Sequence, residues 1–468
     1  MRRLLILVAL LLGAALPAAA AVNHAELVTG PFKTGPDVTK KCLECHEKQA
    51  KDFMKTPHWT WKEEQVIDGK KLAFGKINAI NNFCIALPTN EPRCTSCHAG
   101  YGWKDGSFDF TKAENVDCLV CHDTTGTYKK FPSGAGHPVY EGETKEFPPG
   151  KPWAPVDLVK VAQSVGKPSR ATCGACHFYG GGGDHVKHGD LDSSLAKPSA
   201  EIDVHMGRGG MVCEGCHMAT NHVIKGEALL VAGGGEGLRV QCTDCHKPSA
   251  AHDDPVLVQH TKKVACQTCH IPAMARDLPT KVWWDWSKAG QEIKAETDAF
   301  GMKTYDKMKG EFRWNKDFAP TVMWYDGTVK KMLPGEKIDP KQPVWLVKPL
   351  GDRKNPNARL TPFKIMAGKQ PYDTENRYAV YVNLFGPQGY WKSYDWNQSI
   401  ANGMKAANLP YSGKYDFFET RMAWKVNHMV APKEKALACD DCHGAKGRLD
   451  WKALGYPGDP RKTSSKKP

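Results

Sequence analysis

The sequence predicts a mainly α chain with long loops and a small β and hairpin region, forming one domain over residues 22–446. Three observations lead to this interpretation. Eight Cys-x-x-Cys-His pentapeptides account for all but one of the 17 cysteines. Glycine and proline are frequent, with 44 and 32 residues, so helices must be short and loops long. Residues 271 to about 370 lack the pentapeptide and contain strand-like segments.

Each pentapeptide is typical of a c-type haem attachment site, in which two thiols add to the haem vinyl groups and the histidine reaches the iron. Zinc would need four ligands in a closed site, so zinc sites, like disulfides, remain the minor alternative. We expect eight covalently bound haem c groups, which supply the apolar interior of a single multihaem cytochrome c domain. The predicted attachment residues are Cys42, Cys45, His46, Cys94, Cys97, His98, Cys118, Cys121, His122, Cys173, Cys176, His177, Cys213, Cys216, His217, Cys242, Cys245, His246, Cys266, Cys269, His270, Cys439, Cys442 and His443.

The first 21 residues have the three parts of a secretory signal peptide. Two arginines precede an apolar run from Leu4 to Leu16, and alanines follow it. The run is shorter than the roughly 18 apolar residues of a membrane span. We therefore predict that residues 1–21 are removed, that the mature chain has no transmembrane segment, and that it is periplasmic.

The formal net charge of +13 does not indicate a nucleic-acid-binding protein. Each haem carries two propionates, so eight haems would outweigh the positive charge of the polypeptide. Many lysines and arginines are expected to pair with these carboxylates. No nucleic-acid partner is predicted.

The motifs divide the chain into unequal zones. Seven motifs lie within residues 42–270, and the eighth occupies residues 439–443. A haem-free insert covers about 271–427, and residues 447–468 form a C-terminal tail. Because the gaps between motifs are unequal, the chain is not expected to be a solenoid.

The haem-free insert is expected to contain both strands and helices. The segment FRWNKDFAPTVMWYDGTVKKM, residues 312–332, predicts strands with a hairpin turn at Asp326-Gly327. Three later segments have apolar residues at helical spacing and are predicted helices: 375–385, 397–409 and 417–430.

The remaining histidines predict the second iron ligands. The sequence has 18 histidines, and eight belong to motifs. Electron-transfer haems usually have two strong ligands, so the ten others predict bis-histidine ligation, although a lone histidine is more often a surface or hydrogen-bonded side chain. His185 lies in a glycine-rich loop and is not expected to be a ligand. The predicted second ligands are His24, His58, His137, His188, His205, His222, His252, His260 and His428.

Three segments resemble a known family. Asn81-Asn82-Phe83-Cys84 precedes the second motif, HFYGGGGDHVKHGDLDSSL follows the fourth motif histidine, and NHMVAPKEKALACDDCH contains the eighth motif. With the eight-motif layout, they resemble the octahaem tetrathionate reductase family over essentially the whole mature chain. The resemblance implies that the second haem is the active site, with His98 as one axial ligand and a lysine as the other.

The resemblance also implies the catalytic residues. The distal lysine corresponds to Lys187 in an Asp-x-x-Lys that begins at Asp184, and the distal pocket contains Asn81 and Cys84. The residues alone leave alternatives open. Cys84 is the one cysteine that no haem motif uses, yet it could be an ordinary buried residue. Lys187 could be a solvated loop charge.

The resemblance implies reduction of a small sulfur or nitrogen oxyanion, such as tetrathionate or nitrite, or of hydroxylamine, at the lysine-ligated second haem. The expected partners are the small inorganic anion and a periplasmic or inner-membrane quinol-linked electron donor. The alternative is a multihaem electron-transfer conduit without a substrate of its own. One iron with a replaceable ligand distinguishes the enzyme from the conduit.

We predict that the mature protein carries eight haems, because every attachment pentapeptide is complete. Intact-mass spectrometry should give the mass of the polypeptide without its first 21 or so residues plus eight haems. A fully matured sample with seven or fewer haems would contradict this count.

Overall fold

The computed structural model describes residues 23–67, 69–226 and 239–464. The predicted signal peptide, residues 1–21, lies outside the described residues. The structure has 27% helix and 20% strand, so the expectation of a mainly α chain with a small β region is not confirmed. Within the part of the chain that the structure describes, no helix is long and apolar enough to cross a membrane.

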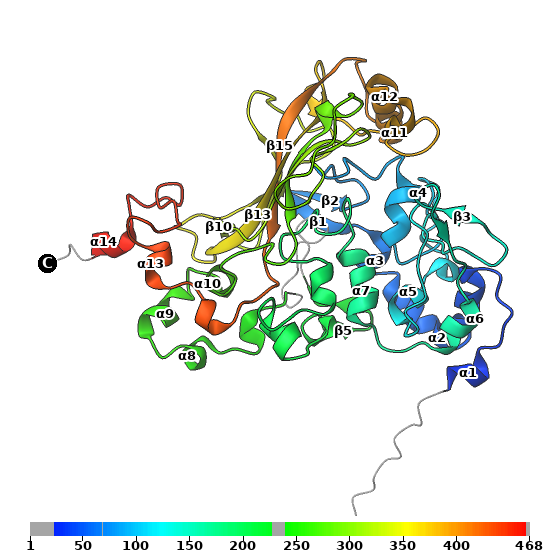
Figure 1. The fold of residues 1–468 in the computed structure, drawn as a ribbon, viewed down its shortest axis with the longest axis horizontal. Helices are drawn as coiled ribbons and strands as arrows, with labels where there is room; N and C mark the ends of the chain where they lie inside the picture. The colour runs from blue at the N-terminus through cyan, green and yellow to red at the C-terminus, as the bar shows by residue number, and fades with distance from the viewer. Residues whose placement is uncertain (1–22, 68, 227–238, 465–468) are drawn as a thin grey trace, which may run out of the picture.

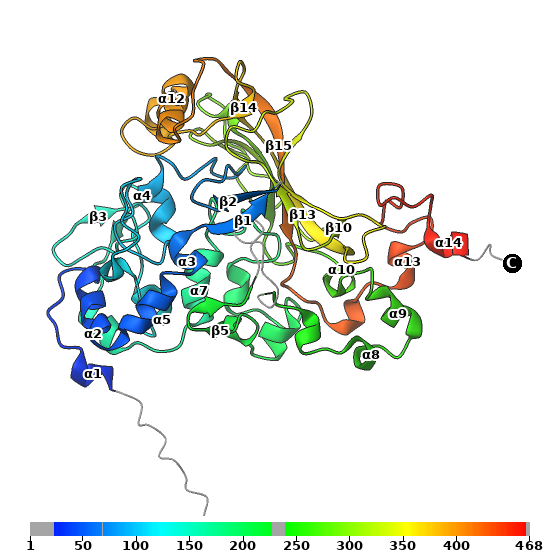
Figure 2. The same ribbon diagram turned by 180° about the vertical axis from the view of Figure 1, so that it is seen from behind.

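Most of the helices are short and follow one side of the molecule, from α1 and α2 at one end to α13 and α14 at the other, whereas α11 and α12 lie apart from this row, at the top of the views (Figures 1 and 2). Several contain a haem motif or part of one, and glycines, prolines and local caps end them early. The α-helices are α1 (His24–Leu27), α2 (Gly35–Phe53), α3 (Pro57–Thr60), α4 (Glu91–Cys94), α5 (Leu119–His122), α6 (Leu158–Gln163), α7 (Arg170–His177), α8 (Pro248–Ala251), α9 (Pro255–His260), α10 (Cys266–His270), α11 (Tyr390–Ser393), α12 (Trp396–Ala406), α13 (Cys439–Cys442) and α14 (Pro460–Ser464).

A mixed nine-stranded sheet lies beside this row of helices (Figure 1). Its main path runs β11-β12-β15-β13-β7-β9-β8, and both β10 and β14 pair with β13. The sheet strands are β7 (Thr280–Asp285), β8 (Tyr305–Asp306), β9 (Gly310–Asn315), β10 (Thr321–Tyr325), β11 (Val329–Lys331), β12 (Val344–Pro349), β13 (Arg359–Asp373), β14 (Tyr378–Ala379) and β15 (Tyr415–Lys425). Three two-stranded ribbons are β1 (Glu63–Ile67) with β2 (Lys70–Phe74), β3 (Lys145–Glu146) with β4 (Pro152–Trp153), and β5 (Ala219–Thr220) with β6 (Val223–Ile224).

Strand β13 organises the sheet. It pairs antiparallel with β15 from Phe363 to Asp373 and parallel with β7. In this register Lys364 lies opposite Trp424, so the two side chains point to the same face of the sheet. The insert between the seventh and eighth motifs is therefore mainly one sheet rather than a helical segment.

Two of the three predicted helices in this insert are wrong. Residues 417–430 lie largely in β15, where Phe418, Thr420 and Met422 are buried in alternation, so the period of two prevails over the helical spacing. Residues 375–385 begin in a turn and contain only β14. Residues 378–382 form a continuous buried run, which periodicity cannot assign. The helix predicted at 397–409 is confirmed as α12, and its Asp395 cap accepts a hydrogen bond from Gln398 N.

The strands predicted over residues 312–332 are confirmed, but the predicted hairpin is wrong. Asp326 forms a local turn by accepting hydrogen bonds from the backbone and side chain of Thr328. The strands on either side do not pair with each other, because β10 pairs with β13 and β11 pairs with β12. The turn predicted at Asp326-Gly327 is therefore present. The pairing of the flanking strands depends instead on strands that are distant in the sequence.

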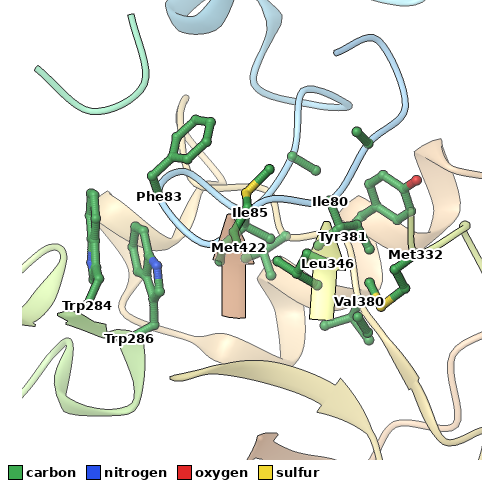
Figure 3. Packing of buried hydrophobic residues seen from close by; sticks show 14 of the residues in the cluster. Ile80, Phe83, Ile85, Trp284, Trp286, Met332, Leu346, Val380, Tyr381 and Met422 are labelled. Carbon is green, nitrogen blue, oxygen red and sulfur yellow. The ribbon is translucent and has the colours of Figure 1, made fainter. Parts of the chain in front are cut away.

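The segment before the second motif packs against this sheet (Figure 3). Phe83 and Ile85 belong to the same buried cluster as Trp284, Trp286 and Met422. Cys84 is partly buried against that cluster. The sheet therefore forms the support on which the segment with Asn81 and Cys84 rests.

Asn90 ties the second motif to the insert. Its side-chain amide donates to Val382 O at 2.8 Å, and its carbonyl oxygen accepts from the backbone N–H groups of Leu384 and Phe385. Asn90 is buried and lies directly before α4, which ends at the first cysteine of that motif. A single side chain thus satisfies backbone groups of two segments that are far apart in sequence.

We expect Asn90→Ala to destabilise the fold, because it leaves buried backbone donors and acceptors without partners. Each such group costs about 1–3 kcal/mol, so the thermal unfolding midpoint should fall clearly in circular dichroism. The exposed Asn357 offers a control, and Asn357→Ala should change the midpoint little. Equal midpoints for the two variants would contradict the role of Asn90.

Candidate functional site

Each of seven motif histidines lies opposite a histidine from outside the motifs, with interplanar angles from 21° to 78°. The ring centroids are 6.0–6.4 Å apart in every case. The pairs are His46 with His24, His177 with His58, His122 with His222, His246 with His205, His217 with His428, His270 with His252, and His443 with His260. Most partners are distant in sequence, so the fold brings them together.

This spacing fits an iron between the two rings. An imidazole nitrogen lies about 2 Å from a metal that it binds, and the ring centroid lies about 1 Å further, so two rings across one iron have centroids roughly 6 Å apart. When Nδ1 of a histidine donates a hydrogen bond to a carbonyl oxygen, Nε2 carries the free lone pair that can bind a metal. Such bonds join His122 to Gly166 O and His217 to Lys225 O, both at 2.8 Å. The donor geometry therefore fits bis-histidine haem sites.

Cysteines of different motifs lie beside one another in four places. The four pairs are Cys42 with Cys118, Cys97 with Cys176, Cys173 with Cys213, and Cys242 with Cys266. The first motif thus adjoins the third, the fourth adjoins both the second and the fifth, and the sixth adjoins the seventh. Cofactors attached at these thiols are close neighbours, as electron transfer between them requires.

The one motif histidine outside these seven pairs, His98 of the second motif, is in a different setting. Its ring is fully buried among Trp59, Trp61 and Trp103. Its Nε2 donates to Trp59 O at 2.6 Å, and among the described residues its Nδ1 has no hydrogen-bond partner. Burial lowers the pKa of His98 to about 3, which keeps the imidazole neutral, the form that binds metals.

Asn81 and Cys84 form a tight turn next to the second motif. The Asn81 side-chain carbonyl accepts from Cys84 N at 2.7 Å and from Phe83 N at 3.2 Å. Burial raises the pKa of the Cys84 thiol, while the positive charges of Lys309 and other nearby cations oppose this. The Cys84 thiol is therefore held protonated in a region of positive potential.

Lys187 lies against this turn. A Cβ on Gly181, whose φ is +100°, would be 3.0 Å from Lys187 Cδ and 3.2 Å from the Phe83 ring, so both side chains border this glycine. The Lys187 ammonium is 5.2 Å from the centroid of the Trp424 ring. Burial, with a contribution from Lys76, lowers the pKa of Lys187 to about 8, which makes the neutral amine more accessible.

Comparisons with known proteins agree with this geometry. The family "Cytochrome c bacterial" matches residues 281–446, "Cytochrome c554 and c-prime" matches 41–123, and "Cytochrome c7 and related cytochrome c" matches 198–271. The crystal structure of octaheme cytochrome c from Shewanella oneidensis is 47% identical, with a TM-score of 0.87, and the alignment covers 96% of this chain and 99% of that one. This chain belongs to the octahaem c-type cytochromes.

The octahaem cytochrome carries covalently bound haem c, as the eight motifs predict. Family membership implies a multihaem redox function. An uncharacterized protein of Archaeoglobus fulgidus is 26% identical over 237 residues, which are 43% of this chain and 80% of that protein.

Three histidines outside the motifs have neighbours of another kind. Among the described residues, His137, His185 and His188 pair with no motif histidine: His137 stacks on Tyr101, and His188 packs edge-on against Trp424. His137 and His188 were expected as ligands, whereas His185 was not. Ligation of an iron by His137 or His188 therefore stays a prediction, and neither ring faces a motif histidine in the described part of the chain.

Within the described residues, neither Asp184 nor His98 forms a hydrogen bond or an ion pair with Lys187. Both carboxylate oxygens of Asp184 accept hydrogen bonds from Ser193, from its backbone N–H and from its hydroxyl. Asp184 therefore shapes the glycine-rich loop. His98 is held by the Trp59 carbonyl, so ligation of iron by His98 requires Nε2 to leave that oxygen.

Sequence reasoning missed the sheet residues at this site. Lys364 is fully buried and donates to the loop of Lys187. Lys281 is also buried, with its ammonium 3.8 Å from the Trp284 ring centroid and 3.3 Å from that of Phe312. The sequence did not single out these lysines, because Lys364 donates to residues far away in the sequence and Lys281 also packs on Phe312 of another strand.

We expect His252→Ala to open one coordination position at the iron of His270. The visible and EPR spectra of the oxidised protein should then gain a high-spin component equivalent to one of the eight haems. His185→Ala is the matched control, since its ring faces Trp314 instead of a motif histidine. A fully low-spin spectrum for His252→Ala would contradict the pairing.

Proposed function

We propose that this octahaem cytochrome is a periplasmic reductase of a small sulfur or nitrogen oxyanion, with Lys187 and His98 as ligands of the second haem. One observation carries the proposal: among the residues that the structure describes, His98 is the motif histidine that faces no second histidine, and Lys187 lies near Cys97 of the same motif. Seven irons with two imidazoles each would only carry electrons. The remaining iron, that of the second haem, would have a ligand that substrate can displace.

The haem groups supply electrons and, at the second iron, a coordination position that a substrate can occupy. The chain supplies the remaining chemistry. An amine on Lys187 can close that position in the absence of substrate and leave when substrate binds. Its lowered pKa supports this role, because only the unprotonated nitrogen can be a ligand.

The surroundings favour an anion. The charges of Lys76, Lys281 and Arg93 all act on Cys84, so this region attracts negatively charged molecules. Cys84 holds a proton at Sγ, and reduction of an oxyanion consumes protons. Tetrathionate, nitrite and hydroxylamine are the substrates to test, with electrons from a quinol-linked donor.

The second candidate is a multihaem electron-transfer conduit without its own substrate. The neighbouring cysteines of different motifs favour it, because adjacent cofactors suit long-range electron transfer. The two functions differ at a single iron. A conduit has no use for a displaceable lysine or for a protonated thiol beside it.

We expect Lys187→Ala to open the second haem. The oxidised protein should gain a high-spin signal and bind nitrite or hydroxylamine with altered affinity. Lys197→Ala, at an exposed position further along the chain, should leave spectrum and kinetics unchanged. If Lys187→Ala stayed low-spin with unaltered kinetics, Lys187 would be only a loop charge and the conduit would be favoured.

Lys187→His gives a complementary result. A second imidazole should hold the iron closed, lower substrate reduction by at least about tenfold, and leave reversible redox cycling of all eight haems intact. Reduction of tetrathionate, nitrite and hydroxylamine with a viologen donor measures the loss. Full activity in Lys187→His would contradict displacement of the ligand.

A further inference from the structure

A buried lysine of the sheet holds the backbone of the Lys187 loop. Lys364, in β13, donates from Nζ to Val186 O at 2.7 Å, to Lys187 O at 3.1 Å and to Thr280 Oγ1 at 2.5 Å. Its side chain is fully buried. Three oxygens therefore accept from one ammonium, and two of them belong to the loop.

Thr280, at the start of β7, extends the same contact. Its hydroxyl oxygen accepts from Lys364 and lies 2.8 Å from the carbonyl oxygens of both His185 and His188. Its single proton can be donated to one of these carbonyls at a time. Together, Lys364 and Thr280 contact the carbonyls of four consecutive residues, 185–188.

Trp424 supports the side chains of the same loop. It lies opposite Lys364 in the register of β13 and β15. Its ring centroid is 5.2 Å from the Lys187 ammonium and 5.2 Å from the His188 ring. Within the described part of the chain, its indole nitrogen has no hydrogen-bond partner. The sheet face thus fixes the backbone with Lys364 and offers the Lys187 side chain an aromatic surface.

A need for stability alone does not account for Lys364. Burying an ammonium is costly, and an apolar side chain of similar size is often neutral or stabilising at such a position. Burial lowers the pKa of Lys364 well below its ordinary value, yet the three directional hydrogen bonds around its Nζ define the position of the loop closely. A lysine at this place is explained by a requirement for a fixed loop.

We propose that Lys364 and Thr280 are positioning residues that hold residues 185–188 still, so that displacement of Lys187 moves only its side chain over Trp424. This inference rests on the proposed role of Lys187 as a ligand. It gives the haem-free sheet a function at the active site. The loop stays in place, and the amine returns to the same iron after each turnover.

The test uses the oxidised holoprotein and the rate at which cyanide binds to it. Loosening the loop should make Lys187 a weaker ligand. Thr280→Val removes the hydroxyl with little change of shape, and we expect cyanide to bind at least about fivefold faster, with a new high-spin component, as loss of one hydrogen bond suggests. Lys364→Met should act in the same direction, and Thr280→Ser should restore the original rate and spectrum.

Thr420→Val is the matched control. Its hydroxyl is also buried in the sheet but bonds to Gly368 O and Gln370 instead of the loop. It should leave the cyanide rate unchanged at equal haem content. An equal acceleration in Thr420→Val would reduce the role of Thr280 to general stability and overturn the proposal.

Lys187→Ala separates the two proposals. If it accelerates cyanide binding while Thr280→Val and Lys364→Met do not, Lys187 is a ligand and the positioning role is overturned. If Lys187→Ala itself has no effect on rate or spectrum, the proposed function fails, and this inference fails with it. Should Lys364→Met not fold, the Thr280→Val and Thr280→Ser pair still decides the outcome.

Discussion

The spacing of histidine pairs is the constraint on which the rest of the structure depends. Each motif fixes a cysteine pair and one imidazole, and seven of these imidazoles have a second histidine at 6.0–6.4 Å. Long helices or large sheets between closely spaced motifs would prevent the second histidine from reaching its partner. Short helices, turns and loops follow from this requirement, and the cofactors replace the apolar core that such a chain cannot build.

The haem-free insert forms its interior in a different way. The insert contains no haem attachment motif, and it buries its own aromatic and aliphatic side chains in one continuous cluster around Trp284, Trp286 and Met422. That cluster is large enough to accept the segment of Phe83 and Ile85 from the haem-binding part (Figure 3). The proposed active site therefore lies where the two kinds of interior meet.

Features that depend on neighbouring residues, such as the haem motifs, could be predicted from the sequence. Pairs of side chains or strands that are distant in the sequence could not. The motif spacing predicted covalent haem c, and the excess of histidines predicted a pool of second ligands. The sequence could not predict that His428 would face His217, or that His137 would stack on Tyr101. Apolar spacing in 417–430 fitted a helix, yet β13 offered this segment a partner along most of its length. Tertiary pairing decides such ambiguous runs.

The same limit applies to the proposed active site. Asn81, Cys84 and Lys187 could be named from sequence because they lie in recognisable segments. Lys364, Thr280 and Trp424 could not, since β13, β7 and β15 meet the Lys187 loop only in the folded chain. If Lys187 leaves the iron and returns to it, the backbone of its loop must stay in the same position. Residues that never touch an iron can therefore govern how a displaceable ligand behaves, and the haem-free insert is where this chain provides them.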